Sequence, residues 1–169
     1  MTEAVIRRAA ATPGAKGRIG IVSPGLAIGT PDEGIASADD YLWRLVAACI
    51  RIGAYNDGDV EAWLHVSDAG FTASTISSTA LAEEVPVQTL VSEGMYWDSF
   101  WKVLREAGYQ LRGMDANSWT AAVSQDINTA QEGHPLWPLA QLFERREHGI
   151  SLSLCGIWSG KHILDWRRQ

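Results

Sequence analysis

The stretch ADDYLWRLVAACIRIG, residues 38–53, decides the fold of this chain. Its polar members Asp40, Arg44 and Arg51 recur at spacings of four and seven residues, so a helix places them on one face. Most other positions are apolar, which predicts a helix with a wide buried surface and one thin stripe that is solvated or salt-bridged. Gly53 is expected to end the helix, because glycine readily adopts the left-handed backbone of a helix C-terminus.

The start of this helix carries its own signals. Ser37 is predicted to cap the first turn, with Asp40 three residues further on as a variant of the capping box. Asp40 and Arg44 are also spaced for an ion pair on the helix surface, worth about 0.2–0.5 kcal/mol if exposed. The neighbouring segments decide whether the apolar surface belongs to a helical bundle or covers a sheet.

Composition indicates a globular protein and excludes several function classes. The chain has 169 residues, 46% of them hydrophobic, and a net charge of −6, and its basic clusters do not exceed an Arg-Arg pair, which argues against nucleic-acid binding. Apolar runs do not reach the length of about 18 residues that a membrane-spanning helix needs. The first residues lack the order of a signal peptide, so we expect a cytoplasmic protein. Cys49 and Cys155 have no metal-ligand spacing and are expected to be buried free thiols.

Hydrophobic periodicity and turn signals divide the chain into helices and strands. Helices are predicted over 2–11, 38–53, 69–81, 96–107, 117–129 and from 134 to about 146, and strands over 18–22, 63–66, 86–90 and 109–111, with 151–154 extended. Ser67 or Asp68 is the expected cap of the helix at 69, and Asp115 or Asn117 that of the helix at 117. The alternation predicts an α/β fold. We expect residues 1–90 to form the end of a sheet domain, into which the helix at 37–53 is inserted as part of a second lobe, and residues 91–169 to form the rest of that mainly helical lobe.

Common catalytic motifs are absent from the sequence. There is no Gly-rich nucleotide loop, Walker loop, GxSxG elbow or HExxH pair, and His65, His134, His148 and His162 are scattered. Neighbouring carboxylates such as the Asp39-Asp40 pair diverge by about 100° on a helix, so they do not form an acid–base pair. We therefore predict neither a catalytic residue nor a metal ligand in this chain.

One turn has the form of a binding element. The apolar run at 18–22 is ended by Ser23-Pro24-Gly25, because proline cannot donate to a strand ladder. If that strand lies in a parallel sheet, the turn lies at its carboxyl edge, where open α/β sheets bind ligands. Gly25 and Gly29 permit a close backbone approach. An ordinary turn at the end of a strand is the alternative, and composition alone does not decide between them.

Several motifs in a fixed order carry a family resemblance. IVSPGLAIG, then DYLWRLVAACIRIGAY, WLHVSDAGFTAS, MYWDSFWKVLREAGYQLRGMDANSWTAAV and HPLWPLAQLFE together resemble the second half of a thioester reductase domain. Such domains end nonribosomal peptide synthetases and polyketide synthases, and belong to the extended short-chain dehydrogenase/reductase superfamily. The segment DYLWRLVAACIRIGAY is most similar to the fungal members of this family. The resemblance implies the C-terminal part of a Rossmann-like domain with a mainly helical substrate-binding lobe.

The resemblance also implies an activity and its partners. The family transfers hydride from NADPH to a thioester on the phosphopantetheine arm of an acyl or peptidyl carrier domain, and releases an aldehyde or an alcohol. The catalytic Tyr-x-x-x-Lys pair and the nucleotide loop belong to the family's N-terminal half and are missing from this sequence. We therefore expect the isolated chain to bind no NADPH and to reduce nothing. Its expected partners are the carrier domain and the nucleotide-binding half.

Particular residues receive roles through this resemblance. At the nicotinamide end of the cofactor we place Ser23, Pro24 and Gly25. As apolar walls for the substrate we place Leu26, Ile28, Trp43, Met95, Trp97 and Trp101, each of which could equally be core. As contacts for an acidic carrier domain we place Lys102, Arg105 and Arg112.

Two departures from the family pattern keep alternatives open. Ser23 stands where the family usually has arginine, and Asp68 in VSDAG is close to the usual aspartate position but shifted. Either change fits a release domain without redox chemistry, such as a Dieckmann-type cyclising domain, or a lobe that only docks a carrier. An extended-fold epimerase or sugar-nucleotide enzyme is a further alternative, but the sequence places few basic residues for a diphosphate in the lobe.

Overall fold

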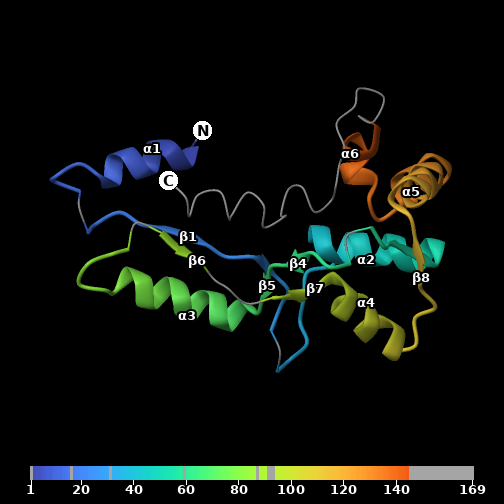
Figure 1. Ribbon diagram of the computed structural model, residues 1–169, viewed down its shortest axis with the longest axis horizontal. Coiled ribbons are helices and arrows are strands. Elements are labelled where there is room, and N and C mark those ends of the chain that lie inside the picture. The colour runs from blue at the N-terminus through green and yellow to red at the C-terminus, as the bar shows by residue number, and fades with distance from the viewer. Residues whose placement is uncertain are drawn as a thin grey trace. The chain divides into compact units, whose positions relative to one another are not determined.

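The computed structural model describes residues 2–15, 17–30, 32–58, 60–86, 88–90 and 94–144 (Figure 1). The chain packs into two compact units, and each is described here by itself. Unit 1 consists of Met1–Ala36 and His65–Gly94, and unit 2 of Ser37–Leu64 and Met95–Gln169. The predictions for 151–154, Cys155, His148 and His162 lie outside the described residues.

Unit 1 contains two parallel strand pairs and two helices. Its elements are α1 (Thr2–Ala10), β1 (Ile21–Ser23), β2 (Leu26–Ala27), β5 (Val66–Ser67), α3 (Ala69–Ala80) and β6 (Gln88–Leu90). β1 pairs with β6 and β2 pairs with β5, both in parallel. The predicted α/β character is therefore confirmed. The three residues of β1 are half-buried, in line with a parallel pair that has few strands beside it.

Helix α3 begins where the sequence allowed two caps. The side chain of Asp68 is the N-cap, and its Oδ1 accepts a hydrogen bond from the backbone N–H of Phe71 at 2.8 Å. This contact satisfies one of the free N–H groups of the first turn. Ser67, the other candidate, is buried in β5, and its Oγ lies 3.0 Å from Thr72 Oγ1.

Unit 2 is mainly helical around two short strand pairs. Its elements are α2 (Tyr41–Ile52), β3 (Ala54–Asn56), β4 (Trp63–Leu64), β7 (Met95–Tyr96), α4 (Trp97–Glu106), β8 (Arg112–Met114), α5 (Ala116–Ala130), η1 (Gln131–Gly133), η2 (Trp137–Leu139) and α6 (Gln141–Glu144). β3 pairs with β8 in parallel, and β4 pairs with β7 antiparallel. Helices α2 and α5 pack on each other and on β3 (Figure 1).

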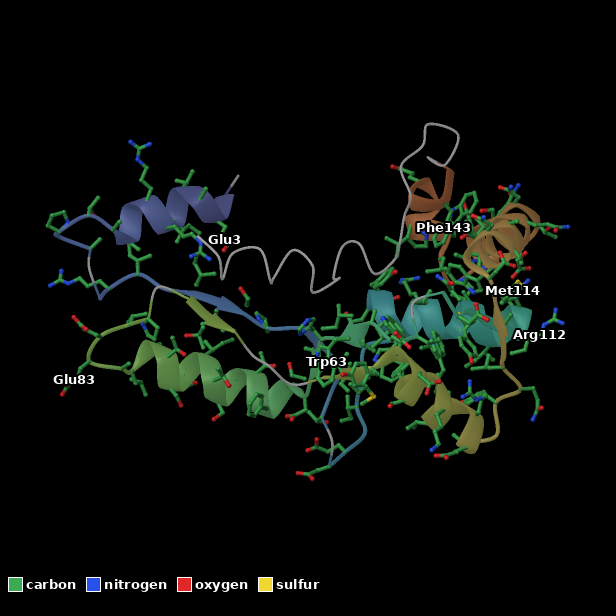
Figure 2. The ribbon with its side chains drawn as sticks, in the orientation of Figure 1. Glu3, Trp63, Glu83, Arg112, Met114 and Phe143 are labelled. Carbon is green, nitrogen blue, oxygen red and sulfur yellow. The ribbon has the colours of Figure 1, made fainter. Side chains whose placement is uncertain are left out.

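The core of unit 2 lies between these helices. Among its most deeply buried side chains are Leu42, Ala48, Cys49, Trp119, Val123 and Leu136. In Figure 2, Phe143 of α6 lies beside α5, where its ring centroid is 6.3 Å from that of Trp119. Burial raises the pKa of the Cys49 thiol to about 12, so this cysteine stays a protonated, unreactive core residue at neutral pH.

The start of α2 corrects one prediction. The N-cap is Asp40, with no hydrogen bond from its side chain, and Ser37 Oγ instead accepts the backbone N–H of Asp39 at 3.3 Å. Arg44 pairs with Asp39 rather than with Asp40. The reason is that the helix begins at Tyr41, so the cap and the pair predicted for an earlier start were wrong. Gly53 ends the helix with φ of 67°, as predicted.

Three further boundaries differ from the predictions. The strand expected at 63–66 is interrupted at His65, because β4 ends at Leu64 and β5 begins at Val66. The strand expected at 109–111 forms three residues later, as β8, because Arg112–Met114 are the residues that pair with β3. The continuous helix expected from His134 is broken into η2 and α6. Pro135 and Pro138 lack the N–H groups that a regular helix there would need.

Candidate functional site

The turn after β1 leads directly into a second parallel pair. β1 ends at Ser23, and after Pro24 and Gly25 the chain resumes as β2. The N–H of Leu26 donates to the carbonyl of His65 at 2.8 Å, and the N–H of Ile28 donates to the carbonyl of Ser67 at 3.0 Å. The turn that the sequence singled out therefore lies at the carboxyl end of a parallel strand, the usual place for a ligand in an open α/β sheet.

The glycines of this turn allow close approach by the protein's own backbone. A Cβ added at Gly25 would lie 2.3 Å from the carbonyl oxygen of His65, and one added at Gly29 would lie 2.1 Å from that of Ile35. Gly29 also has φ of 112°, a conformation that favours glycine. Internal packing thus suffices to explain both glycines. A cofactor contact at Gly25 stays a prediction that has to rest on other groups nearby.

The remaining predicted residues of this turn are half-buried. Ser23 and Pro24 lie at the strand end, with Ser23 opposite Leu90 of β6. Leu26 and Ile28 stand two residues apart along β2 and its continuation, so their side chains share one face. Both remain partly accessible, and the structure therefore leaves these residues able to contact a ligand.

His65, which lies between β4 and β5, packs beside this turn, and the sequence did not single it out for a role there. The backbone carbonyl of His65 accepts the hydrogen bond from the N–H of Leu26. The Cβ of His65 lies 3.1 Å from the position of a Cβ added at Gly25. Burial lowers the pKa of the His65 imidazole, so the ring is neutral at pH 7. Its Nδ1 is buried and has no hydrogen-bond partner among the described residues. The sequence could not reveal this place, because it follows from the pairing of β2 with β5.

Unit 2 brings two of the predicted substrate residues together in an aromatic cluster. Trp101 stacks on Tyr55 with ring centroids 4.9 Å apart and on Trp97 at 5.5 Å, and Phe100 meets it edge-on at 5.3 Å. Trp101 is only 3% exposed, whereas Trp97 is half-buried at the edge of the cluster. Trp101 therefore supports the cluster as core, and Trp97 is the member that a bound chain could reach.

Met95 and Trp43 occupy separate places in unit 2. Met95 is half-buried in β7, opposite Leu64 of β4. Next to it in the same strand pair, Trp63, labelled in Figure 2, meets Tyr96 edge-on at 5.1 Å. Trp43 is half-buried on α2, and within the described ranges no ring contact joins it to the cluster of Trp101. Its buried indole nitrogen has no hydrogen-bond partner there either.

The three basic residues predicted to face a carrier domain have different surroundings. Arg105 donates to the hydroxyl of Tyr55 at 2.6 Å and lies over the same ring, 5.4 Å from its centroid. Lys102 is exposed and 3.9 Å from Glu106, and Arg112 is exposed on β8. Arg105 thus has a structural role that would have to be broken for docking, whereas Lys102 and Arg112 are accessible.

The polar stripe predicted for α2 is salt-bridged. Arg51 pairs with Asp126 of α5, and Nε2 of the buried His134 lies 3.3 Å from the same carboxylate oxygen. Arg44 donates to the carbonyl of Pro135 at 2.9 Å. These contacts attach α2 to α5 and to the turn that follows α5, although Arg51 itself remains exposed.

His134 is held in one neutral form. Its Nδ1 accepts the backbone N–H of Leu136 at 3.0 Å, so Nδ1 carries no proton and Nε2 does. Burial lowers the pKa of His134 and nearby Arg51 adds to this, while Asp126 opposes it. Protonating Nδ1 would replace an accepted hydrogen bond with two facing N–H groups, so the folded state resists the second proton.

We expect the free energy of unfolding to fall as the pH falls from 7 to 5. Unfolded His134 takes a proton near its ordinary pKa of about 6.5, whereas the folded residue takes it only at lower pH. The slope from one such group cannot exceed about 1.4 kcal/mol per pH unit. Urea unfolding of the native chain and of His134→Gln at several pH values measures it. Burial also lowers the pKa of His65, so His134→Gln should keep a smaller pH dependence of the free energy of unfolding than the native chain. An unchanged pH dependence in the variant would show that His134 does not cause it.

Two kinds of site were sought in the part of the chain that the structure describes, a metal centre and a membrane span. They contain no cluster of His, Cys, Asp or Glu that could hold a metal ion. Among the helices described, none is long and apolar enough to cross a membrane. The turn offers hydroxyl, imidazole and backbone groups to a neutral ligand, and it lacks the glycine-rich loop that cradles a pyrophosphate.

Proteins similar to this chain are found among curated sequences and among solved structures. No protein-family model matches the chain. Peramine synthetase A of Epichloe festucae is 41% identical over 145 residues, which cover 85% of this chain and 5% of that protein. The chain therefore spans only a small part of such a relative.

Two solved structures have a similar fold. The PhqB reductase domain of Penicillium fellutanum superposes with a TM-score of 0.72 at 30% identity, over 85% of this chain and 40% of that one. The terminal R domain of the myxalamid pathway superposes with a TM-score of 0.60 at 19% identity, over 75% of this chain and 32% of that one, and supports the fold alone. The chain belongs to the terminal reductase domains of nonribosomal peptide synthetases and corresponds to a C-terminal portion of such a domain.

Proposed function

We propose that this chain is the substrate-binding portion of an NADPH-dependent thioester reductase. The complete domain would release a carrier-bound acyl or peptidyl thioester as an aldehyde or an alcohol. The observation that carries the proposal is the parallel strand β1 leading into the Ser23–Gly25 turn, within a fold similar to the PhqB reductase domain at 30% identity. A parallel strand that ends in such a turn is where α/β enzymes bind their ligands.

The residues of this chain would bind and orient rather than transfer protons. When bound in the complete domain, NADPH would supply the hydride for the thioester carbonyl. Ser23, Pro24 and Gly25 would border the nicotinamide end of that cofactor. The apolar residues Leu26, Ile28, Trp43, Met95 and Trp97 would contact the acyl chain, with Trp101 beneath Trp97. Apolar contacts of this kind orient a substrate and exclude water from the reacting bond.

The proposal includes two partners and a compartment. A phosphopantetheinylated carrier domain would present the thioester, and the exposed Lys102 and Arg112 are its proposed contacts. The nucleotide-binding half of the reductase would supply the phosphate site and the proton donor. We propose that the protein acts in the cytoplasm, where the buried free thiol of Cys49 is compatible with a reducing environment.

A turnover assay tests the proposal. A reductase domain that carries this chain as its C-terminal portion is mixed with NADPH and a carrier loaded with an acyl thioester. We expect thioester-dependent loss of NADPH absorbance and release of an aldehyde or alcohol, and we expect none from the isolated chain. Release of a cyclised product without NADPH oxidation would favour the Dieckmann-type alternative, which the Ser23 position motivates. Carrier binding with no release at all would favour a docking lobe.

A further inference from the structure

We infer that His65 binds the carboxamide group of the nicotinamide ring. This inference rests on the proposed function, since it assumes that the Ser23–Gly25 turn borders the cofactor. It adds a side-chain contact to a turn whose other groups are a hydroxyl and backbone atoms. Three features of His65 support it: its place beside the turn, its face of the strand pair and the chemistry of its ring.

The first step is the place of His65 beside the turn. β2 and β5 run parallel with Leu26 opposite Val66, so Gly25 and His65 are neighbours one residue earlier. The hydrogen bond of 2.8 Å from Leu26 N–H to the His65 carbonyl fixes this register. Because Gly25 has no side chain, the His65 backbone can lie against it, where an added Cβ would be 2.3 Å from the His65 oxygen. The imidazole is thus attached at the level of Gly25.

The second step concerns the face of the β2–β5 strand pair on which the side chain of His65 lies. Side chains alternate along a strand, so His65 and Ser67 lie on the same face as Gly25 and Ala27. Gly25 has no side chain and Ala27 has only a methyl group, while Ser67 is buried and its hydroxyl lies 3.0 Å from that of Thr72. Of these four described residues, only His65 has a polar side chain that is not already engaged. A ligand bound against Gly25 on this face therefore meets the imidazole.

The third step is the chemistry of the ring. Nδ1 is buried without a partner among the described residues and the ring as a whole is half-buried, so we assign the ligand contact to Nε2. Burial lowers the pKa of the ring, so at pH 7 Nε2 belongs to a neutral imidazole that either donates or accepts. A primary carboxamide has both donor and acceptor groups and pairs with either form. A phosphate would need a positive charge, which a neutral imidazole does not provide.

The test uses a complete reductase domain carrying this chain, with His65→Ala and His65→Gln as variants. Losing one hydrogen bond between neutral groups should raise KM for NADPH about five- to tenfold. His65→Gln, whose amide nitrogen can reach the place of Nε2, should recover most of this loss. Adenosine 2′,5′-bisphosphate, which has no nicotinamide, should inhibit all three proteins equally. The 3-acetylpyridine analogue, which keeps the carbonyl oxygen but lacks the carboxamide NH₂, serves as a second coenzyme: a smaller effect of His65→Ala shows that Nε2 accepts from the NH₂, and an equal effect shows that Nε2 donates to the carbonyl oxygen.

Each other outcome overturns the inference. An unchanged KM for NADPH in His65→Ala would show that the ring makes no cofactor contact. Equal weakening of the bisphosphate inhibitor, or loss without rescue in His65→Gln, would assign His65 a purely structural role. A raised KM for the carrier thioester alone would place the ring on the substrate. Failure of the proposed function itself is distinguishable, because the unaltered domain would then oxidise no NADPH in the presence of the thioester.

Discussion

Replacing Trp101 by alanine is expected to lower the free energy of unfolding of unit 2 by about 3–5 kcal/mol. The indole is 3% exposed and contacts Tyr55, Trp97 and Phe100. Removing it opens a cavity and also removes stacking contacts worth about 0.5–1.5 kcal/mol per aromatic pair. Urea unfolding followed by far-ultraviolet circular dichroism measures the change, and Trp101→Phe provides a folded variant if the alanine form does not fold.

The matched control for this prediction is Tyr109→Ala. Tyr109 follows α4, is 45% exposed, and makes no ring contact with another described residue. Exposed substitutions away from packed features usually change stability by about 0.5 kcal/mol or less. Equal losses for Trp101→Ala and Tyr109→Ala would contradict the core assignment. If Trp101 instead lined an open substrate wall, its removal would raise the substrate KM with little loss of stability.

Gly25→Ala is expected to disrupt the strand pair beside the proposed cofactor turn. The new Cβ would lie 2.3 Å from the His65 carbonyl oxygen, a backbone atom that already accepts the N–H of Leu26. One of the two segments must move, at a cost of about 1–3 kcal/mol for overpacking and about 1 kcal/mol for the hydrogen bond. Hydrogen exchange at the amides of Leu26 and Ile28 should accelerate, and reduction by a complete domain carrying the change should fall.

Gly14→Ala is the control for this substitution. Nothing lies within 4 Å of a Cβ added at Gly14, so the change should leave stability within about 0.5 kcal/mol. If Gly25→Ala also leaves exchange at Leu26 and Ile28 unchanged, the close approach of His65 to the turn is not present in solution. Such a result would also remove the geometric basis for assigning His65 to the cofactor.

Local patterns in the sequence predicted the helices better than the strands. The periodicity of residues 38–53 and the glycine at 53 predicted the body and end of α2, and Asp68 and Asp115 were among the predicted caps. These features depend on residues a few positions apart. The start of α2 was wrong by three residues, because Ser37 and Asp40 both have side chains suited to a cap and the sequence does not choose between them.

The unpredicted features depend on pairings between distant residues. Arg51 and Asp126 meet because α2 packs on α5, and nothing in either segment alone indicates it. His65 lies beside Gly25 only through the pairing of β2 with β5. Trp97 and Trp101, in contrast, stack because they lie four residues apart on one helix, a spacing that the sequence shows directly. The roles of both in substrate binding, and those of Ser23 and Pro24 at the cofactor, stay predictions.

The central claim is that this chain holds the substrate side of a reductase while its nucleotide site lies in another part of the domain. Titrating the isolated chain with NADPH tests it most directly, and energy transfer from its eight tryptophans to the bound dihydronicotinamide provides the signal. The account predicts no saturable transfer from the isolated chain and saturable transfer from a complete reductase domain. Tight, saturable NADPH binding by the isolated chain would contradict it.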